Sequence, residues 1–124
     1  MQISFFEEFP TKENLAKIKF VSFPTKLYLA AHSLEEFHKV KISSSHVKEK
    51  IYWPILQKNE GYWFSPFSKR KAVKRILEEL KNKNVSVMID CELPTHPQPS
   101  LYFTELPFFF YTRKKIRHFI SSHY

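Results

Sequence analysis

The chain has 124 residues, of which 43% are hydrophobic and 17% aromatic, so it is long enough and apolar enough for one domain with a buried core. Its single glycine, Gly61, excludes a P-loop or a Gly-rich dinucleotide-binding turn, because both need several glycines where the backbone approaches phosphate. The net charge of +8 favours anionic partners, although a lysine-rich solvated surface has the same composition.

Cysteine content and apolar runs indicate where the protein resides. The single cysteine, Cys91, forms no internal disulfide, which fits a reducing compartment. The apolar runs are shorter than the roughly 20 residues of a membrane-spanning helix, and the N-terminus lacks the pattern of a signal peptide. We therefore predict a cytoplasmic protein.

Short apolar runs and helix-start signals alternate along the chain. Thr11 follows the first run and can cap a helix, and Ser33 with Glu36 matches a capping box after the second. After Ser68, a further capping residue, apolar residues recur at helical spacing: Ala72, Val73, Ile76, Leu77 and Leu80. The predicted elements, in chain order, are strand 3–8, helix 12–19, strand 26–31, helix 34–40, strand 51–53, helix 69–82, strand 85–90 and helix 107–121.

This order predicts a single α/β domain over residues 1–124, with four βα units and a parallel sheet covered by helices. Two architectures suit four such units. One is half of a TIM-like (β/α)8 barrel, whose full size of about 250 residues matches two copies of this chain. The alternative is an open flavodoxin-like sheet. A half-barrel would expose strand edges, so it would need a homodimeric partner or a missing C-terminal half.

Three segments resemble the N-terminal half of an uncharacterised prokaryotic (β/α)8-barrel-type protein family. They are residues 5–10 (FFEEFP), 62–70 (YWFSPFSKR) and 90–95 (DCELPT). The resemblance spans most of the chain and carries no established catalytic signature. It implies a barrel-type fold and a chain that lacks the C-terminal half.

Carboxylates follow the first and last predicted strands. Ligands of parallel α/β folds bind at the carboxyl ends of strands, where Glu8, Asp90 and Glu92 would share one rim. Such carboxylates suit acid–base hydrolysis, or would hold a divalent metal such as Mg²⁺ without any other cofactor. The alternative is that polar residues simply return where a strand ends. The histidines and the one cysteine show no metal-ligand spacing, so no zinc site is predicted.

A second candidate site lies at the start of the predicted helix 69–82. Lys69 and Arg70 would occupy the first turn, where the helix dipole disfavours cations unless an anion is bound. We therefore predict an anion-binding site formed by Ser65, Ser68, Lys69 and Arg70. The alternative is a solvated basic face that continues along the helix.

Two tryptophans, Trp53 and Trp63, form a candidate aromatic platform for a sugar ring or a base. Core packing is the alternative for both, because large rings dominate the cores of aromatic chains.

Two functions remain open from the sequence. The first is a hydrolase that acts on an anionic or sugar-containing substrate, with the rim carboxylates as catalytic groups and an anionic small molecule as partner. The alternative is a non-catalytic basic module that binds RNA or an anionic membrane surface through residues 69–75 and 113–118.

Overall fold

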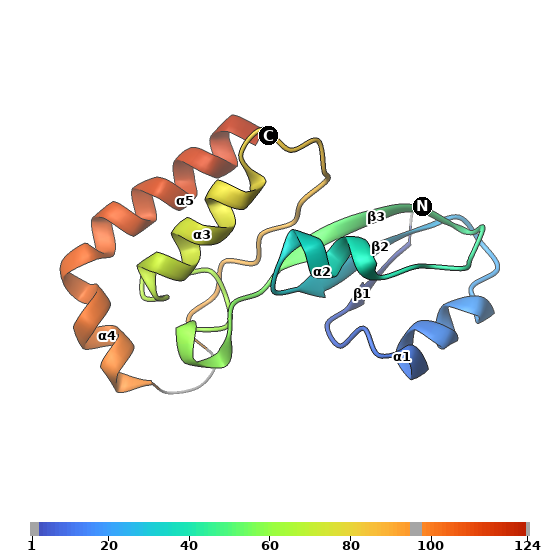
Figure 1. The fold of residues 1–124 in the computed structure, drawn as a ribbon, viewed down its shortest axis with the longest axis horizontal. Helices are drawn as coiled ribbons and strands as arrows, with labels where there is room; N and C mark the ends of the chain where they lie inside the picture. Colours follow the sequence, from blue (N-terminus) through green and yellow to red (C-terminus); the bar gives the residue numbers. More distant parts are fainter. Residues whose placement is uncertain (1–2, 95–97, 124) are drawn as a thin grey trace. The chain divides into compact units, whose positions relative to one another are not determined.

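The computed structural model describes residues 3–94 and 98–123, and the chain divides into two compact units (Figure 1). The first unit comprises the residues up to Pro54 together with Asn84–Met88. The second comprises Ile55–Lys83 together with the residues from Ile89 onward. The single domain over residues 1–124 stays a prediction, and each of the two units has its own packed elements.

The first unit is built on a three-stranded parallel sheet in the order β1-β2-β3 (Figure 1). A helix connects each strand to the next. The elements of this unit are β1 (Ser4–Glu7), α1 (Lys12–Ala16) with a 3₁₀ turn (Lys17–Phe20), β2 (Thr25–Ala31), α2 (Leu34–Lys39) and β3 (Val47–Pro54).

The central strand β2 carries most of the core of this unit. Leu27, Leu29 and Ala30 are almost completely buried, as expected for a parallel strand with neighbours on both sides. Leu29 pairs with Tyr52 of β3, and the ring of Phe37 from α2 lies 5.2 Å from that of Tyr52. The helix α2 therefore packs on the face of the sheet that Leu29 and Tyr52 share.

The predicted helix caps of this unit are largely confirmed. The backbone N–H of Asn14 donates to the Thr11 hydroxyl at 3.2 Å, so Thr11 caps α1. The Ser33 hydroxyl accepts a hydrogen bond from the N–H of Glu36 at 3.1 Å and caps α2. The Glu36 carboxylate bonds to the N–H of His32 at 3.0 Å, one residue before the partner that a capping box predicts.

Lys50 of β3 bonds the carbonyl groups at the C-terminal end of α2. Its ammonium group donates to the carbonyls of Phe37 and Val40, at 2.9 and 2.8 Å, and lies 4.3 Å from the centre of the Phe37 ring. Carbonyls in the last turn of a helix have no partner within the helix, so a cation there stabilises it. Partial burial lowers the pKa of Lys50 below its ordinary value.

Residues 85–90 are among the described residues, but they do not form the predicted fourth strand. Val87 forms one isolated parallel bridge with Tyr52, whose N–H donates to Ser86 and whose carbonyl accepts from Met88, both at 2.9 Å. Two residues further, the carbonyl of Asp90 accepts from the N–H of Phe64 in the second unit. The segment 85–90 pairs with β3 at this single bridge and then separates from it. A local apolar run predicts an extended segment but does not specify which distant groups its backbone will bond.

The predicted fold class is therefore wrong. The described residues form a small α/β structure with three parallel strands and five α-helices, instead of four βα units. Neither half of a TIM-like barrel nor an open flavodoxin-like sheet of four units is present.

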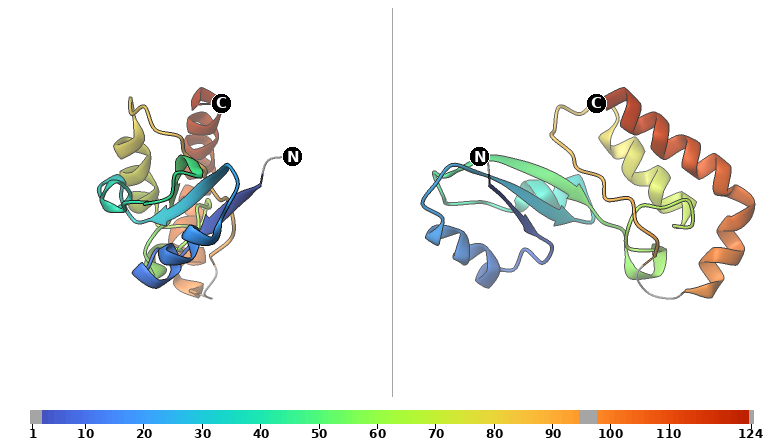
Figure 2. Two further views of the ribbon diagram at one scale, coloured as in Figure 1. Left: turned by 90° about the vertical axis from the view of Figure 1, so that its right-hand side faces the viewer. Right: turned by 180° about the vertical axis from the view of Figure 1, so that it is seen from behind.

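The second unit is helical. Its elements are a 3₁₀ turn (Lys58–Glu60), α3 (Arg70–Leu80), α4 (Pro99–Glu105), a 3₁₀ turn (Leu106–Phe108) and α5 (Phe109–His123). Figure 1 and the right-hand view of Figure 2 show α3 and α5 side by side, and residues of the two helices are in contact. The predicted helices 69–82 and 107–121 correspond to α3 and α5, whereas α4 is new. It lies between the predicted strand 85–90 and the predicted helix 107–121, and it begins at Pro99, because proline is tolerated in the first turn of a helix.

The single glycine holds the loop before α3 in place. Gly61 has φ = 112°, which residues with a Cβ rarely adopt, and a Cβ there would lie 2.8 Å from the Ser68 hydroxyl oxygen. Ser68 is not the N-cap of α3 as predicted, because Lys69 holds that position without a side-chain cap. The Ser68 hydroxyl donates to the carbonyl of Trp63 at 2.6 Å instead, and accepts from the N–H of Ser65 at 3.0 Å.

Candidate functional site

The three predicted catalytic carboxylates do not all belong to one unit. Glu8 lies in the first unit, after β1, whereas Asp90 and Glu92 lie in the second. The rim that would join them depends on a fourth strand, which the described residues do not form. No group of three or more His, Cys, Asp or Glu side chains in the described part of the chain is arranged to hold a metal ion.

The predicted anion site at the start of α3 already contains an anion, which is the protein's own. The carboxylate of Glu105, a buried residue of α4, accepts a hydrogen bond from the backbone N–H of Arg70 at 3.3 Å. The next-upstream amide, that of Lys69, donates to the carbonyl of Glu60 at 2.8 Å. Glu105 therefore meets the preference of this positive helix end for a negative charge.

Three of the four side chains of that predicted site, those of Ser65, Ser68 and Arg70, are also engaged within the protein, whereas Lys69 is exposed. Ser65 and Ser68 are buried, and the Ser65 hydroxyl accepts from the N–H of Phe67 at 3.0 Å. The guanidinium carbon of Arg70 lies 3.4 Å from the centre of the Phe108 ring, a close cation–π contact. The start of α3 is therefore bonded largely by groups of the protein itself.

The two predicted platform tryptophans are both buried and belong to different units. Trp53 is 6% exposed and its ring lies edge-on to Phe6 at 5.8 Å, in the first unit. Trp63 is 8% exposed and lies edge-on to Tyr62 at 4.6 Å, in the second unit. Burial of both indoles leaves little ring surface on which a sugar or base could stack.

One exposed row of side chains runs along α4, the 3₁₀ turn and α5. Its first three members are large and apolar, and their exposed fractions are 78% for Phe103, 58% for Leu106 and 78% for Phe110. Residues three or four apart share one face of a helix, so the row continues through Lys114 and Arg117. We call these five residues the outer row.

The outer row stands opposite the packed face of the same helices. Leu101, Glu105, Thr112, Ile116 and Phe119 repeat at the same spacing and are all buried. Among the described residues, no ion pair involves Lys114 or Arg117, and both are exposed. The outer row therefore combines exposed apolar side chains at one end with unneutralised cations at the other.

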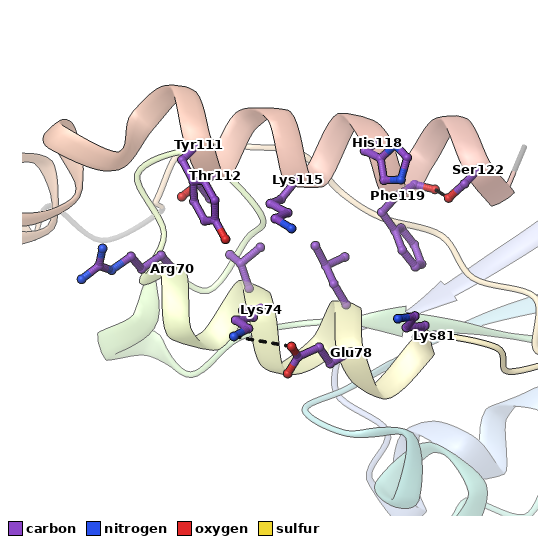
Figure 3. Close-up of a pocket in the computed structure, with 12 residues that line it drawn as sticks. Arg70, Lys74, Glu78, Lys81, Tyr111, Thr112, Lys115, His118, Phe119 and Ser122 are labelled. Carbon is purple, nitrogen blue, oxygen red and sulfur yellow. Dashed lines mark hydrogen bonds and ion pairs between the residues drawn. The ribbon is translucent and has the colours of Figure 1, made fainter.

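A groove between α3 and α5 is the second candidate surface (Figure 3). It has a volume of about 360 Å³, within the range of small-ligand sites. Val73 and Leu77 of α3 and Phe119 of α5 give it apolar walls, and Figure 3 shows the rings of Tyr111 and Phe119 directed from α5 toward α3. We call this the interhelical groove.

Positive charge predominates around the interhelical groove. The cationic residues that line it are Arg70, Lys74, Lys81 and Lys115, and His118 lies beside them. The one acidic residue among its lining residues, Glu78, lies 3.6 Å from Lys74 in an exposed ion pair, drawn as a dashed line in Figure 3. A ligand in this groove would meet an apolar surface bordered by cations.

Sequence reasoning found part of these surfaces and missed the rest. The segments 69–75 and 113–118, which the sequence predicts to be the binding surface of a basic module, contribute Arg70, Lys74, Lys114, Lys115, Arg117 and His118. The sequence predicts no helix over 99–105, so it does not place Phe103 and Leu106 on a helical row. Their spacing to Phe110, at i, i+3 and i+7, is a signal that becomes visible once the helix is recognised.

Comparison of the chain with protein-family models, with curated proteins and with solved structures finds no match. The resemblance to a barrel-type family is thus without support from any relative, and the three-stranded sheet lacks the half-barrel that it implied. Within the described ranges, no helix combines the length and the apolar character needed to span a membrane.

Proposed function

We propose that the second unit is a non-catalytic basic module that docks on an anionic membrane surface through the outer row. The observation that carries the proposal is that Phe103, Leu106 and Phe110 are exposed at successive three- and four-residue spacings, and that the same spacing continues on α5 through Lys114 and Arg117. An interfacial helix needs this pairing, since its apolar side chains enter the lipid boundary while its cations contact anionic headgroups.

The magnitudes favour a reversible docking module. Full burial of a Leu or Phe side chain contributes about 1.5–3 kcal/mol, and each Lys or Arg near an anionic leaflet contributes about 1 kcal/mol. The whole second unit carries twelve Lys and Arg against six Asp and Glu, a net charge of +6 that strengthens attraction to any anionic surface. The first unit has eight against six, a net charge of +2.

A membrane explains the outer row better than RNA does. Proteins that bind RNA stack bases on aromatic rings and contact phosphates with cations. Phe103 and Phe110 could serve as such rings, but Leu106 between them has none and is more than half exposed. An aliphatic side chain in the middle of the row gains free energy from hydrocarbon and little from a base.

The proposal requires no metal or cofactor, and the predicted cytoplasmic location suits it. Anionic phosphatidylserine and phosphoinositides concentrate in the cytoplasmic leaflet, which gives that surface a negative potential. The hydrolase function, which the sequence analysis places first, relies on a rim of carboxylates, and that rim requires a fourth strand that the described residues do not form.

The test is co-sedimentation of the full chain with phosphatidylcholine vesicles, with and without phosphatidylserine. We expect binding only to the anionic vesicles, and the double change Phe103→Ser with Phe110→Ser should weaken it by at least about tenfold. Phe20→Ser is the matched control, because Phe20 is 77% exposed but belongs to the first unit.

Two outcomes would contradict this function. One is equal binding of the double variant and the unchanged chain to anionic vesicles, which would remove the outer row from the interaction. The other is salt-sensitive binding of single-stranded RNA, measured by fluorescence anisotropy, together with no vesicle binding. That pattern would assign the basic surface to RNA instead.

A further inference from the structure

The interhelical groove offers a binding site for a small ligand, separate from the outer row. It lies between Val73 and Leu77 on α3 and Phe119 on α5, so its walls suit an alkyl chain. Arg70 and Lys81 line it from the two ends of α3. At 1.5 Å per residue they are about 16 Å apart along the helix axis, so the groove follows most of the length of α3.

One residue that lines this groove, Thr112, has a buried hydroxyl without a hydrogen-bond partner among the described residues. Thr112 is 2% exposed. A buried polar group without a partner is costly, and most buried hydroxyls in proteins have one. A ligand oxygen that accepts from this hydroxyl would remove the cost.

The charged residues near the Thr112 hydroxyl indicate the charge of the ligand group that would bind there. Lys115 lies three residues after Thr112 on α5, so both side chains are on one helical face, and both line the groove. Figure 3 shows the Lys115 ammonium group between the two helices. Among the lining residues the only carboxylate is that of Glu78, which is already next to Lys74. An anionic head is therefore favoured over a neutral or a cationic one.

We propose that the interhelical groove binds a single-chain anionic amphiphile of the fatty-acid class. The carboxylate accepts hydrogen bonds from Thr112 and Lys115, and the alkyl chain lies along Val73, Leu77 and Phe119. A volume of about 360 Å³ is at the lower end of known ligand sites and suits one chain of medium length. This inference does not rest on membrane docking, because the two surfaces use different side chains.

The test is a calorimetric titration of the full chain with laurate below its micelle concentration and without vesicles. We expect saturable binding of laurate, no binding of acetate, which has the charge without the chain, and much weaker binding of dodecanol, which has the chain without the charge. Thr112→Val should weaken laurate binding by about tenfold, because it keeps the shape of the side chain and removes the hydroxyl.

A stability measurement and a second substitution distinguish loss of laurate binding from loss of folding. Thr112→Val should unfold at the same denaturant concentration as the unchanged chain or a higher one, because the hydroxyl that it removes has no partner. Lys115→Met should weaken laurate binding as well, whereas Lys114→Met, one residue away and outside the groove lining, should not.

The proposal is overturned if laurate does not saturate, if dodecanol binds as tightly as laurate, or if Thr112→Val and Lys115→Met both leave laurate affinity unchanged. Saturable binding of an acidic helical peptide in place of laurate would also overturn it. Failure here is distinct from failure of the proposed function, because Thr112→Val should leave vesicle binding intact and the Phe103 and Phe110 changes should leave laurate binding intact.

Discussion

In the first unit, cations beside the sheet are held by groups of the protein itself, whereas α5 of the second unit presents most of its cations to the surroundings. Lys26 lies 2.7 Å from Glu49, which also accepts from the Ser86 hydroxyl, and Lys50 bonds two carbonyls of α2. Lys114 and Arg117 have no ion pair among the described residues. In these examples the cations of the first unit bond groups of the protein, whereas Lys114 and Arg117 of the second unit are exposed at its surface.

The Glu60–Arg75 pair is where the second unit departs from this contrast, and its removal should have the largest effect. The guanidinium donates to both carboxylate oxygens, at 3.1 and 3.0 Å, and Glu60 also accepts from the N–H of Gln57. Glu60→Gln should lower the free energy of unfolding at neutral pH by about 1.5–3 kcal/mol, measured by urea denaturation.

The same pair predicts a pH dependence. The bond from Arg75 lowers the pKa of Glu60 below its ordinary value of 4.5, so its contribution is complete above that pH. It is lost as the pH falls through the lowered pKa, and the difference between Glu60→Gln and the unchanged chain should shrink over that range. Glu78→Gln is the control, because its exposed pair with Lys74 is worth about 0.3–0.5 kcal/mol. A constant difference down to the most acidic pH would contradict this assignment.

Gly61 should be the next most sensitive position. Gly61→Ala forces a Cβ into a left-handed conformation and against Ser68, so we expect a loss of about 1–3 kcal/mol in the free energy of unfolding. Asn59→Ala, in the same loop at an exposed position, is the control and should change stability little. Equal stability of the two variants would mean that the loop before α3 is free to rearrange.

Lys50 tests the structural use of cations in the first unit. Lys50→Met keeps the aliphatic stem and removes the ammonium group from the end of α2, so stability should fall by up to about 2 kcal/mol. The measurement is the midpoint of urea denaturation. An unchanged midpoint would show that burial of the charge offsets its hydrogen bonds, and the contrast between the units would then lose this example.

Lys114→Met is the matched change in the second unit and should have the smallest effect on stability. We expect a shift below about 0.5 kcal/mol, because Lys114 is exposed and forms no ion pair among the described residues. Binding to vesicles that contain phosphatidylserine should nevertheless weaken by a few-fold. A large loss of stability would instead give Lys114 a structural role like that of Lys50.

The sequence by itself determined the elements whose signals are local. Ser33 and Thr11 cap α2 and α1 because a cap joins residues only three positions apart. The apolar spacing of Ala72, Val73 and Ile76 fixes the buried face of α3, because helical periodicity repeats within a few residues. The buried run of β2 is likewise a local pattern.

Tertiary structure alone decided the features that join distant residues. Whether 85–90 became a strand depended on partners far along the chain, and its backbone meets β3 at one bridge only. Whether the start of α3 would bind an external anion depended on Glu105, which is 35 residues from Arg70. The interhelical groove exists only where α3 and α5 pack, and its unsatisfied Thr112 hydroxyl has no signature in the sequence. Local periodicity records which face of an element is apolar, but not which element will cover that face.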